Sequence, residues 1–385
     1  MTPAARVAAA ADILDAVLQG GAAEQVLTGW ARRSRFAGSG DRAAIRDLVF
    51  DALRRRRSYA ALGGAETGRG LMLGALRDAG RDPAEIFTGV GHAPAPLRPE
   101  EQAADAPDDP LVRLDCPDWL APDLRASLGP DFEPVLSRLR DRAPVFVRVN
   151  TLRGGVEAAA GALAAEGIAT RADPLSATAL EVVQGARRLA RSAAYRDGLV
   201  ELQDAASQAV VDLLPLGPRI LDFCAGGGGK ALALAARAPS AQIAAHDADA
   251  GRMRDLPARA ARAGARIELL APGSAPEGAY DLVLADAPCS GSGAWRRAPQ
   301  GKWLLDRAGL DRLLALQDRV LDAAAASVAP GGVLAYATCS LLDAENGERV
   351  RAFRAMHPGW SEGPVRRLTP LDGGDGFFVA CLKRD

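Results

Sequence analysis

The chain has no long apolar run and no targeting segment. No stretch approaches the roughly 18 consecutive apolar residues that a membrane-spanning helix requires, so we expect no membrane association. The N-terminal residues, Met1-Thr2-Pro3-Ala4-Ala5-Arg6, include no basic region followed by an apolar stretch, which argues against a secretory signal. Hydrophobic residues make up 48% and charged residues 25% of the sequence, as in folded, water-soluble proteins. Together these features predict a cytoplasmic protein.

Cysteine is scarce, and its spacing excludes two common uses of this residue. The chain has five cysteines, an odd number, and no two of them form a Cys-x-x-Cys pair. This pattern fits neither a disulfide framework nor a zinc site, so we expect no bound metal. A reducing compartment is the simplest interpretation.

Lysine is almost absent. The basic charge comes from arginine apart from Lys230, Lys302 and Lys383, and the formal net charge is −1 at pH 7. This balance argues against a protein that coats nucleic acid indiscriminately, but it allows a specific RNA enzyme, because local patches of charge matter more than the total. Lys230 is notable because it directly follows four glycines.

The first sixty residues predict a helical, arginine-rich region. Apolar residues recur at helical spacing over 5–60, with glycines interrupting the pattern. From Arg6 to Arg57 the sequence has ten arginines and six acidic residues, and it ends in the run 54–57 of four arginines. This run fits a phosphate-binding surface. It fits equally a solvated helix end, where cations interact favourably with the helix dipole.

The pattern of elements divides the chain into four regions. We expect an all-helical N-terminal domain over 1–90, a linker with short helices over 91–142, a small α+β module over 143–200 and a Rossmann-like α/β domain over 201–385. In the last region, strands expected at 219–223, 242–247, 266–270, 281–286, 332–338 and 377–382 alternate with helices, the longest over 308–329. This alternation predicts a doubly wound parallel sheet. Pro330-Gly331-Gly332 is expected to end the long helix.

A glycine-rich turn between a predicted strand and a predicted helix indicates a cofactor site. Its residues, starting after Asp222 and Phe223, are Cys224, Ala225, Gly226, Gly227, Gly228, Gly229 and Lys230. Glycines let the backbone approach a ligand, and amides at a helix start favour a carboxylate. Asp247 ends the next strand, where a carboxylate commonly binds ribose hydroxyls. Because alanine at 231 breaks the dinucleotide fingerprint, S-adenosylmethionine fits better than a nicotinamide cofactor.

Two cysteines and a carboxylate stand at the ends of predicted strands. Asp286-Ala287-Pro288-Cys289 follows one apolar run and Thr338-Cys339-Ser340 follows another. Such strand ends line the ligand crevice of an open α/β sheet. A thiolate there can add to C6 of a pyrimidine and activate C5 toward a methyl donor, with a carboxyl group near N3. We therefore expect methylation of carbon 5 of a pyrimidine in RNA, with Asp286 at N3 and either Cys339 or Cys289 as nucleophile. Taken singly, each cysteine also fits a small buried apolar residue.

These motifs resemble those of RNA (cytosine-5) methyltransferases. The segments 286–293 and 337–340 are similar to the two signature motifs of that family, and 222–230 is similar to its cofactor turn. Three further segments resemble its pre-catalytic segment, its RNA-contacting strand and its closing strand: 203–208, 148–151 and 375–378. Residues 4–60 resemble the NusB-like RNA-binding domain of the bacterial RsmB-type (Sun/Fmu) branch, which modifies a cytosine of small-subunit ribosomal RNA.

The resemblance implies a role for each matched residue. Cys339 would be the nucleophile, Cys289 would assist breakdown of the covalent adduct, and Asp286 would contact both the base and the methionine part of the cofactor. Residues 224–230 would wrap S-adenosylmethionine, with Asp247 on its ribose. The implied partner is RNA, in particular 16S ribosomal RNA, and no protein partner is required. The residues expected to contact RNA are Arg148, Asn150, Gln203, Asp204, Arg296 and Arg297.

Some features leave alternatives open. Trp295-Arg296-Arg297 suits base stacking and phosphate contact, but Trp295 equally fits a packing role. Glu345-Asn346 is expected to cap or orient the helix after Cys339, or to serve structure alone.

The sequence also departs from the family pattern in its cofactor region. Gly226 and Gly227 replace the family's alanine and proline, and the segment 270–274 lacks the aspartate that the family places near adenine. The alternatives are therefore a transfer RNA cytosine-5 methyltransferase, or a non-catalytic RNA-binding ribosome assembly factor that has lost cofactor affinity.

Overall fold

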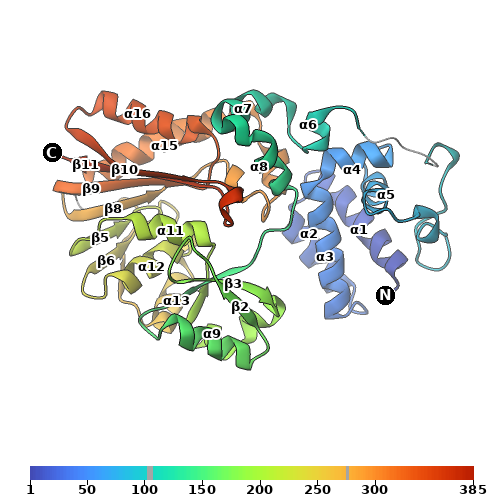
Figure 1. Cartoon of the computed structure of the whole chain (residues 1–385), viewed down its shortest axis with the longest axis horizontal. Coiled ribbons are helices and arrows are strands. Elements are labelled where there is room, and N and C mark those ends of the chain that lie inside the picture. The colour runs from blue at the N-terminus through green and yellow to red at the C-terminus, as the bar shows by residue number, and fades with distance from the viewer. Residues whose placement is uncertain (102–106, 275–276) are drawn as a thin grey trace. The chain divides into compact units, whose positions relative to one another are not determined.

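The computed structural model describes residues 1–101, 107–274 and 277–385, which form two compact units (Figure 1). Unit 1 comprises Met1–Arg125, Gly129–Arg142 and Trp295–Leu304, and unit 2 comprises Ala126–Leu128, Ala143–Ala294 and Leu305–Asp385. Residues 102–106, within the predicted linker, lie outside the described residues. In the part of the chain that the structure describes, no helix is long and apolar enough to cross a membrane.

Unit 1 is helical, as predicted for its N-terminal part. Its helices are α1 (Pro3–Leu18), α2 (Ala23–Arg33), α3 (Ser39–Arg54), α4 (Arg56–Gly63), α5 (Gly68–Asp78), α6 (Pro110–Arg113), α8 (Phe132–Leu139) and α14 (Gln300–Leu304), with α7 (Ala121–Leu128) shared between the units. Thr2 starts α1, because its hydroxyl accepts a hydrogen bond from the Ala5 amide at 3.1 Å. In α5 a Cβ atom at Gly68 would lie 1.9 Å from the Ala11 carbonyl oxygen, and one at Gly74 would lie 2.0 Å from that of Tyr59. Glycine at these two positions therefore lets α5 pack closely against α1 and α4.

Unit 2 begins with a small antiparallel sheet. The strands β1 (Phe146–Val149), β2 (Ala169–Ala172), β3 (Ala179–Gln184) and β4 (Val200–Leu202) pair in the order β2-β3-β1-β4. Helices α9 (Val156–Ala165) and α10 (Ala193–Arg196) complete the module. Its core includes Val147, Leu163, Leu180 and Val200. Three of the four strands match predicted ones, whereas β4, only three residues long, was not predicted.

A seven-stranded sheet dominates unit 2, with the order β10-β11-β9-β8-β5-β6-β7. Its strands are β5 (Arg219–Asp222), β6 (Gln242–Ala245), β7 (Ile267–Leu269), β8 (Tyr280–Asp286), β9 (Val328–Thr338), β10 (Trp360–Leu368) and β11 (Phe377–Arg384). Its helices are α11 (Ala205–Leu213), α12 (Gly229–Arg237), α13 (Leu256–Ala263), α15 (Arg307–Ala326) and α16 (Gly347–Met356). This α/β architecture confirms the predicted fold class.

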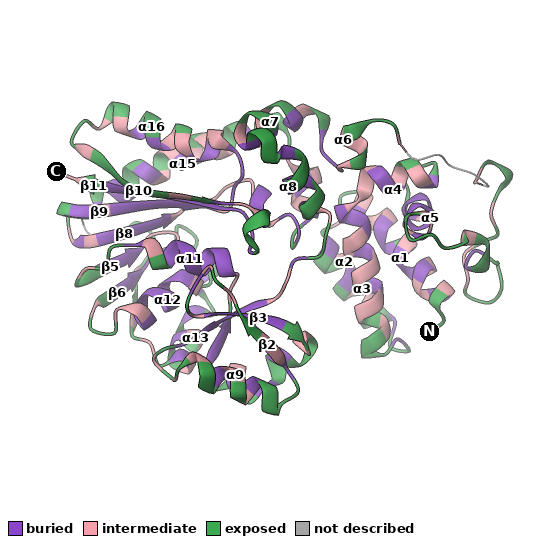
Figure 2. Cartoon of the chain, viewed as in Figure 1, coloured by how far each residue is buried: buried purple, intermediate pink, exposed green. Residues whose placement is uncertain are grey.

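Helices cover both faces of this sheet, so its central strands are buried on two sides (Figure 2). Successive side chains of β8 point to opposite faces of the sheet. Leu282 and Leu284 pack with residues of α11 and α12, while Val283 and Ala285 pack with residues of α15 and α16. This double burial explains why Leu282–Ala285 of β8 form an uninterrupted apolar run in the sequence.

Three details of the predicted sheet were wrong. The sheet is mixed, because β11 runs antiparallel to β9 and to β10. Strand β10 was not predicted, since it contains Gly363, Pro364 and several charged residues and is mostly exposed at the sheet edge. The long helix ends at Ala326, before Pro330-Gly331-Gly332, which lies inside β9 where the pairing with β8 is irregular.

Candidate active site

The parallel register of β8 and β9 brings the two predicted cysteine motifs together. Asp286 pairs with Ala337 at the carboxyl ends of these strands, and the Ala287 amide donates to the Ala337 carbonyl at 2.8 Å. The chain after each strand then turns so that the Sγ atoms of Cys289 and Cys339 lie 3.5 Å apart. Both thiols are free. The crevice expected from the sequence thus holds two sulfur atoms in contact.

The surroundings of Cys289 favour its protonated form. The hydrogen bond with Cys339, burial, and the negative charges that Cys339 and Glu345 can carry raise the pKa of the Cys289 thiol well above its ordinary value. At neutral pH this sulfur therefore keeps its proton.

Lys230 joins the cofactor turn to the first cysteine motif. Its Nζ lies 2.6 Å from Oδ2 of Asp286 and 5.0 Å from the centre of the Phe377 ring. Burial lowers the pKa of Lys230, but the ion pair with Asp286 more than offsets this effect, so the pKa is raised overall. Negative charge on Cys339 would raise it further. A buried ammonium group thus stands beside Asp286, with an electrostatic interaction with Cys339.

The glycine-rich turn has the backbone conformation that its sequence predicts. Gly226 and Gly228 have φ of +50° and +78°, where side chains are disfavoured. A Cβ atom at Gly228 would also lie 2.1 Å from a methyl group of Leu256. The turn leads directly into α12, so its amides are at a helix start.

A cavity of about 140 Å³ lies at this turn. Its lining residues are Gln203, Ser207, Asp222, Cys224, Ala225, Gly229, Lys230 and Asp286. This volume is that of roughly five water molecules, so the cavity suits one end of an extended cofactor. Five of the predicted cofactor-binding residues line it; Gly226, Gly227, Gly228 and Asp247 do not.

Asp222 is the most unusual carboxylate of the cavity. It is fully buried, and neither carboxylate oxygen has a hydrogen-bond partner of normal geometry among the described residues. Burial, followed by the charge of Asp286, raises the pKa of Asp222 to about 7. The same burial, with Asp222 and Asp286 nearby, raises the pKa of the Cys224 thiol to about 12. An uncompensated buried carboxyl group beside a cavity fits a cationic ligand group, such as the ammonium of an amino acid.

Asp247 is engaged by the protein itself. Its carboxylate accepts hydrogen bonds from the Gly226 amide at 2.9 Å and the Asp249 amide at 3.0 Å, and Arg252 lies 3.2 Å away. The neighbouring His246 contacts the segment in which the sequence lacks an aspartate, because the Gly273 amide donates to its Nε2 at 3.2 Å. The sequence predicted no role for His246.

Several residues expected to contact RNA are buried instead. Arg148 donates from Nε to Gln203 Oε1 at 2.6 Å, and burial lowers its pKa to about 10. The Asn150 amide donates to the carbonyls of Gly198 and Ala263, both at 2.8 Å, and thereby ties the small sheet to α13. Asp204 caps α11 through the Ala206 amide at 2.9 Å. These side chains serve internal contacts, and their RNA contacts stay predictions.

The segment 295–304 also differs from its predicted character. Trp295 is 1% exposed and Arg296 is buried, which favours packing for Trp295, whereas Arg297 is exposed. Lys302 is buried, donates to the Arg54 carbonyl at 3.1 Å, and has its pKa lowered to about 8 by burial. The Trp303 indole donates to the Leu53 carbonyl at 2.6 Å. Within unit 1 this segment therefore packs on the end of α3.

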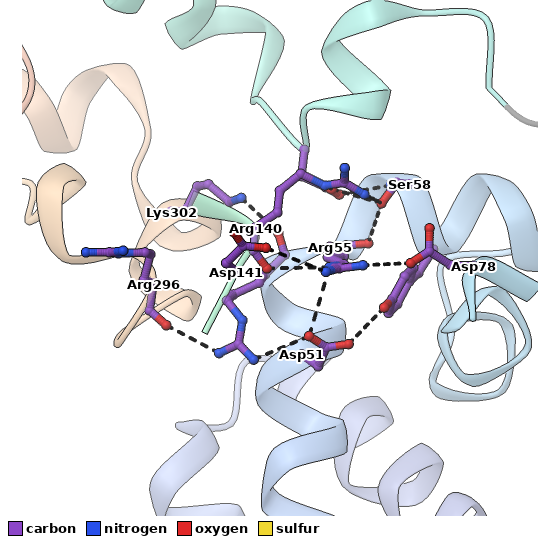
Figure 3. Close-up of polar contacts among 11 residues, drawn as sticks. Asp51, Arg55, Ser58, Asp78, Arg140, Asp141, Arg296 and Lys302 are labelled. Carbon is purple, nitrogen blue, oxygen red and sulfur yellow. Dashed lines mark hydrogen bonds and ion pairs between the residues drawn. The ribbon is translucent and has the colours of Figure 1, made fainter. Parts of the chain in front are cut away.

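The arginine run 54–57 forms ion pairs inside unit 1, and Figure 3 shows those of Arg55. Arg55 lies 2.6 Å from Asp78 and 4.0 Å from both Asp51 and Asp141. Arg57 lies 2.6 Å from Asp118, and Arg56 pairs with Glu66. Arg54 is buried and donates to the Arg296 carbonyl at 3.3 Å. The run does begin at the end of α3, but carboxylates distant in sequence pair with it, so it is not a freely solvated helix end, and its contact with phosphate stays a prediction.

The sequence analysis did not predict that Glu345 links the two cysteine loops. Its fully buried carboxylate accepts hydrogen bonds from Ser290 and Ser340, the residues that directly follow Cys289 and Cys339. It does not cap α16, where Asn346 holds the N-cap position. The only available signal was the paired Cys-Ser sequence followed by an acidic residue.

Comparisons with known proteins identify the same family. The family of 16S rRNA methyltransferases RsmB/F matches residues 214–383, and the ferredoxin-like domain of RsmF/B-like methyltransferases matches residues 116–187. Ribosomal RNA small subunit methyltransferase B of Xylella fastidiosa (strain Temecula1) is 35% identical over 300 residues, covering 72% of this chain and 69% of that protein. The proteins of the same name from Xanthomonas campestris and Serratia proteamaculans are 36% and 34% identical to this chain over 69% of its residues. The chain spans 66% of the length of each of these relatives.

Solved structures agree in fold. The structure of PH0851 has a TM-score of 0.80 at 23% identity, covering 100% of this chain and 99% of that one. A methyltransferase homologue from Pyrococcus horikoshii has a TM-score of 0.63 at 24% identity, covering 71% of this chain and 97% of that one. The resemblance inferred from the motifs is thus confirmed: the chain belongs to the RsmB/F family of 16S rRNA methyltransferases.

Proposed function

We propose that this protein transfers a methyl group from S-adenosylmethionine to carbon 5 of a cytosine in 16S ribosomal RNA. The observation that carries the proposal is the 3.5 Å contact between the thiols of Cys289 and Cys339 at the crevice that also holds the Lys230–Asp286 pair. Relatives named ribosomal RNA small subunit methyltransferase B support the substrate class.

The residues around the cavity fit S-adenosylmethionine. Asp222 would accept the ammonium group of the cofactor, which satisfies its unpartnered carboxylate. The amides at the start of α12, at Gly229 and Lys230, would receive the carboxylate. Asp247 would bind the ribose, which requires its contact with Arg252 to open. The cofactor supplies an electrophilic methyl group.

The two cysteines would divide the covalent chemistry. The Cys339 thiolate would form a bond to C6 of cytosine, and a proton of the Lys230–Asp286 pair, passed to N3 through Asp286, would neutralise the electron pair that moves into the ring. C5 would then take the methyl group, and the sulfonium sulfur of the cofactor would leave as a neutral thioether. Loss of the C5 proton to a base returns the electron pair, and the bond between Cys339 and C6 breaks. Cys289, in contact with Cys339, is placed to assist this elimination.

RNA binding would involve more than the catalytic crevice. The helices over 1–90 would act as a NusB-like RNA-binding domain, followed by the linker 91–142, the RNA-contacting module 143–200 and the catalytic domain 201–385. Arg297 is the exposed candidate of its segment for phosphate contact. A cytoplasmic location follows from a ribosomal RNA substrate.

The direct test is transfer of labelled methyl groups from S-adenosylmethionine to small-subunit ribosomal RNA, with transfer RNA as a competing substrate. We expect transfer by the wild type, none by Cys339→Ala, and a denaturation-resistant protein–RNA adduct with Cys289→Ala. Full activity of Cys339→Ala would move the nucleophile to Cys289. A wild type that binds RNA without transferring methyl groups would favour an assembly factor.

A further inference from the structure

Glu345 forms the centre of a buried hydrogen-bond network around the two cysteine loops. Its Oε1 accepts from the Ser290 amide at 2.8 Å and from Gln317 Nε2 at 2.9 Å. Its Oε2 accepts from the hydroxyls of Ser290 and Ser340. In this arrangement all four contacts place a donor on the carboxylate, two from N–H groups and two from hydroxyls, which is the pattern that satisfies an acceptor-only carboxylate.

This network fixes the loops relative to one another. Gln317 of α15 also donates to the Pro288 carbonyl at 3.0 Å, next to Cys289. Ser292 bridges to the second loop, because its Oγ lies 3.1 Å from Ser340 Oγ and accepts the Leu341 amide at 2.8 Å. Removing the carboxylate would leave donors of both loops unsatisfied.

The charges around the two sulfur atoms are arranged asymmetrically. Glu345 contributes to the raised pKa of Cys289, whereas the positive charge of Lys230 interacts with Cys339. Other ionisable groups nearby are Tyr336, whose hydroxyl donates to the Glu345 carbonyl at 2.7 Å, and the pair of Arg349 and Asp318, 3.0 Å apart. Asp286 is already paired with Lys230. Negative charge is thus disfavoured on Cys289, which is the side of the thiol pair that Glu345 adjoins through Ser290.

We propose that ionised Glu345 is a positioning residue that holds Cys289 against Cys339 and confines the reactive thiolate to Cys339. This inference rests on the proposed function, and it gives a physical reason why Cys339 rather than Cys289 would be the nucleophile. The sequence chemistry alone had left that choice open.

The test is alkylation of the wild type and Glu345→Gln by limiting iodoacetamide, between pH 6 and 10, with each cysteine quantified by mass spectrometry. We expect Cys339 to be modified first in the wild type. In Glu345→Gln the pH midpoint for Cys289 should fall by about one pH unit, because a carboxylate at short range is lost. The preference for Cys339 at pH 8 should then drop about tenfold.

Glu348→Gln is the matched control, since Glu348 lies three residues further on and is exposed. It should keep the wild-type preference. An unchanged preference in folded Glu345→Gln would overturn the proposal. The assay needs neither RNA nor cofactor, so an absence of methyl transfer would reject the proposed function without deciding this question.

A second variant covers the case in which Glu345→Gln does not fold. Ser290→Ala removes the hydroxyl that donates to Oε2 of Glu345, so the negative charge of this carboxylate is less compensated by hydrogen bonds. We expect the preference for Cys339 over Cys289 to rise in this variant. An unchanged or lower preference would contradict the electrostatic role of Glu345.

Discussion

The Nζ atom of Lys230 lies 2.6 Å from Oδ2 of Asp286, although 56 residues separate them in the chain. This contact links the turn proposed to bind the cofactor to the motif that contains Cys289. The lysine is buried and the carboxylate is half-buried, so each charge depends on the other. If the turn binds the cofactor as proposed, the pair would couple that binding to the position of the loop that contains Cys289.

Lys230→Met should impair both activity and stability. It leaves Asp286 without its cation and removes positive charge near Cys339, so we expect methyl transfer to fall at least about a hundredfold. The free energy of unfolding should fall by about 2 kcal/mol, because a half-buried ion pair loses one partner. Lys383→Met, at an exposed lysine, should change neither quantity. Wild-type activity of Lys230→Met would exclude a role for the pair.

Asp222→Asn should stabilise the free protein at high pH. The pKa of Asp222 is raised to about 7 in the folded state, from an ordinary value near 4. The folded protein thus binds this proton more tightly, and the stability contribution of Asp222 falls as pH rises from about 4 to 7. Urea unfolding should show Asp222→Asn equal to the wild type near pH 4 and more stable at pH 8, by up to about 4 kcal/mol.

The same variant should bind S-adenosylmethionine more weakly, since it lacks the charge that would meet the ammonium group. Calorimetric titration measures this affinity directly. Unaltered affinity would place the ammonium group elsewhere, whatever the stability result.

Lys302 should make stability depend on pH in the alkaline range. Burial lowers its pKa to about 8 in the folded state, below the ordinary value of about 10.4. Between these values the unfolded chain binds the proton more tightly, so the stability contribution of Lys302 rises with pH from about 8 to 10. Lys302→Met should lose this rise, which amounts to up to about 3 kcal/mol. Lys383→Met should retain it, and an identical slope in both variants would contradict the assignment.

Asn150→Ala should act through folding more than through RNA. Two buried carbonyls, of Gly198 and Ala263, lose their donor, so we expect the free energy of unfolding to fall by about 2 kcal/mol. The dissociation constant for ribosomal RNA, corrected for the folded fraction, should stay within about twofold of the wild type. Weaker RNA binding by a fully stable variant would instead support the RNA-contacting role implied by the family resemblance.

Much of the fold could be predicted from local patterns. Apolar runs such as Leu282–Ala285 mark strands buried on two faces, and glycines mark the turn after Asp222, because both signals depend on neighbours in sequence. Strand β10 escaped prediction because an exposed edge strand requires few apolar residues. The two cysteine motifs could also be found from local sequence, because each directly follows an apolar run that marks a strand.

By itself, the sequence determined the family, the helical and α/β regions, and the pairing of two cysteine motifs at strand ends. Only the tertiary structure decided which polar groups are buried and with which partners. It buries Arg148, Asn150 and Arg296, neutralises the arginine run with distant carboxylates, and places Glu345 between the cysteine loops. These outcomes depend on contacts between residues far apart in the chain, and residue type and spacing alone do not specify such contacts.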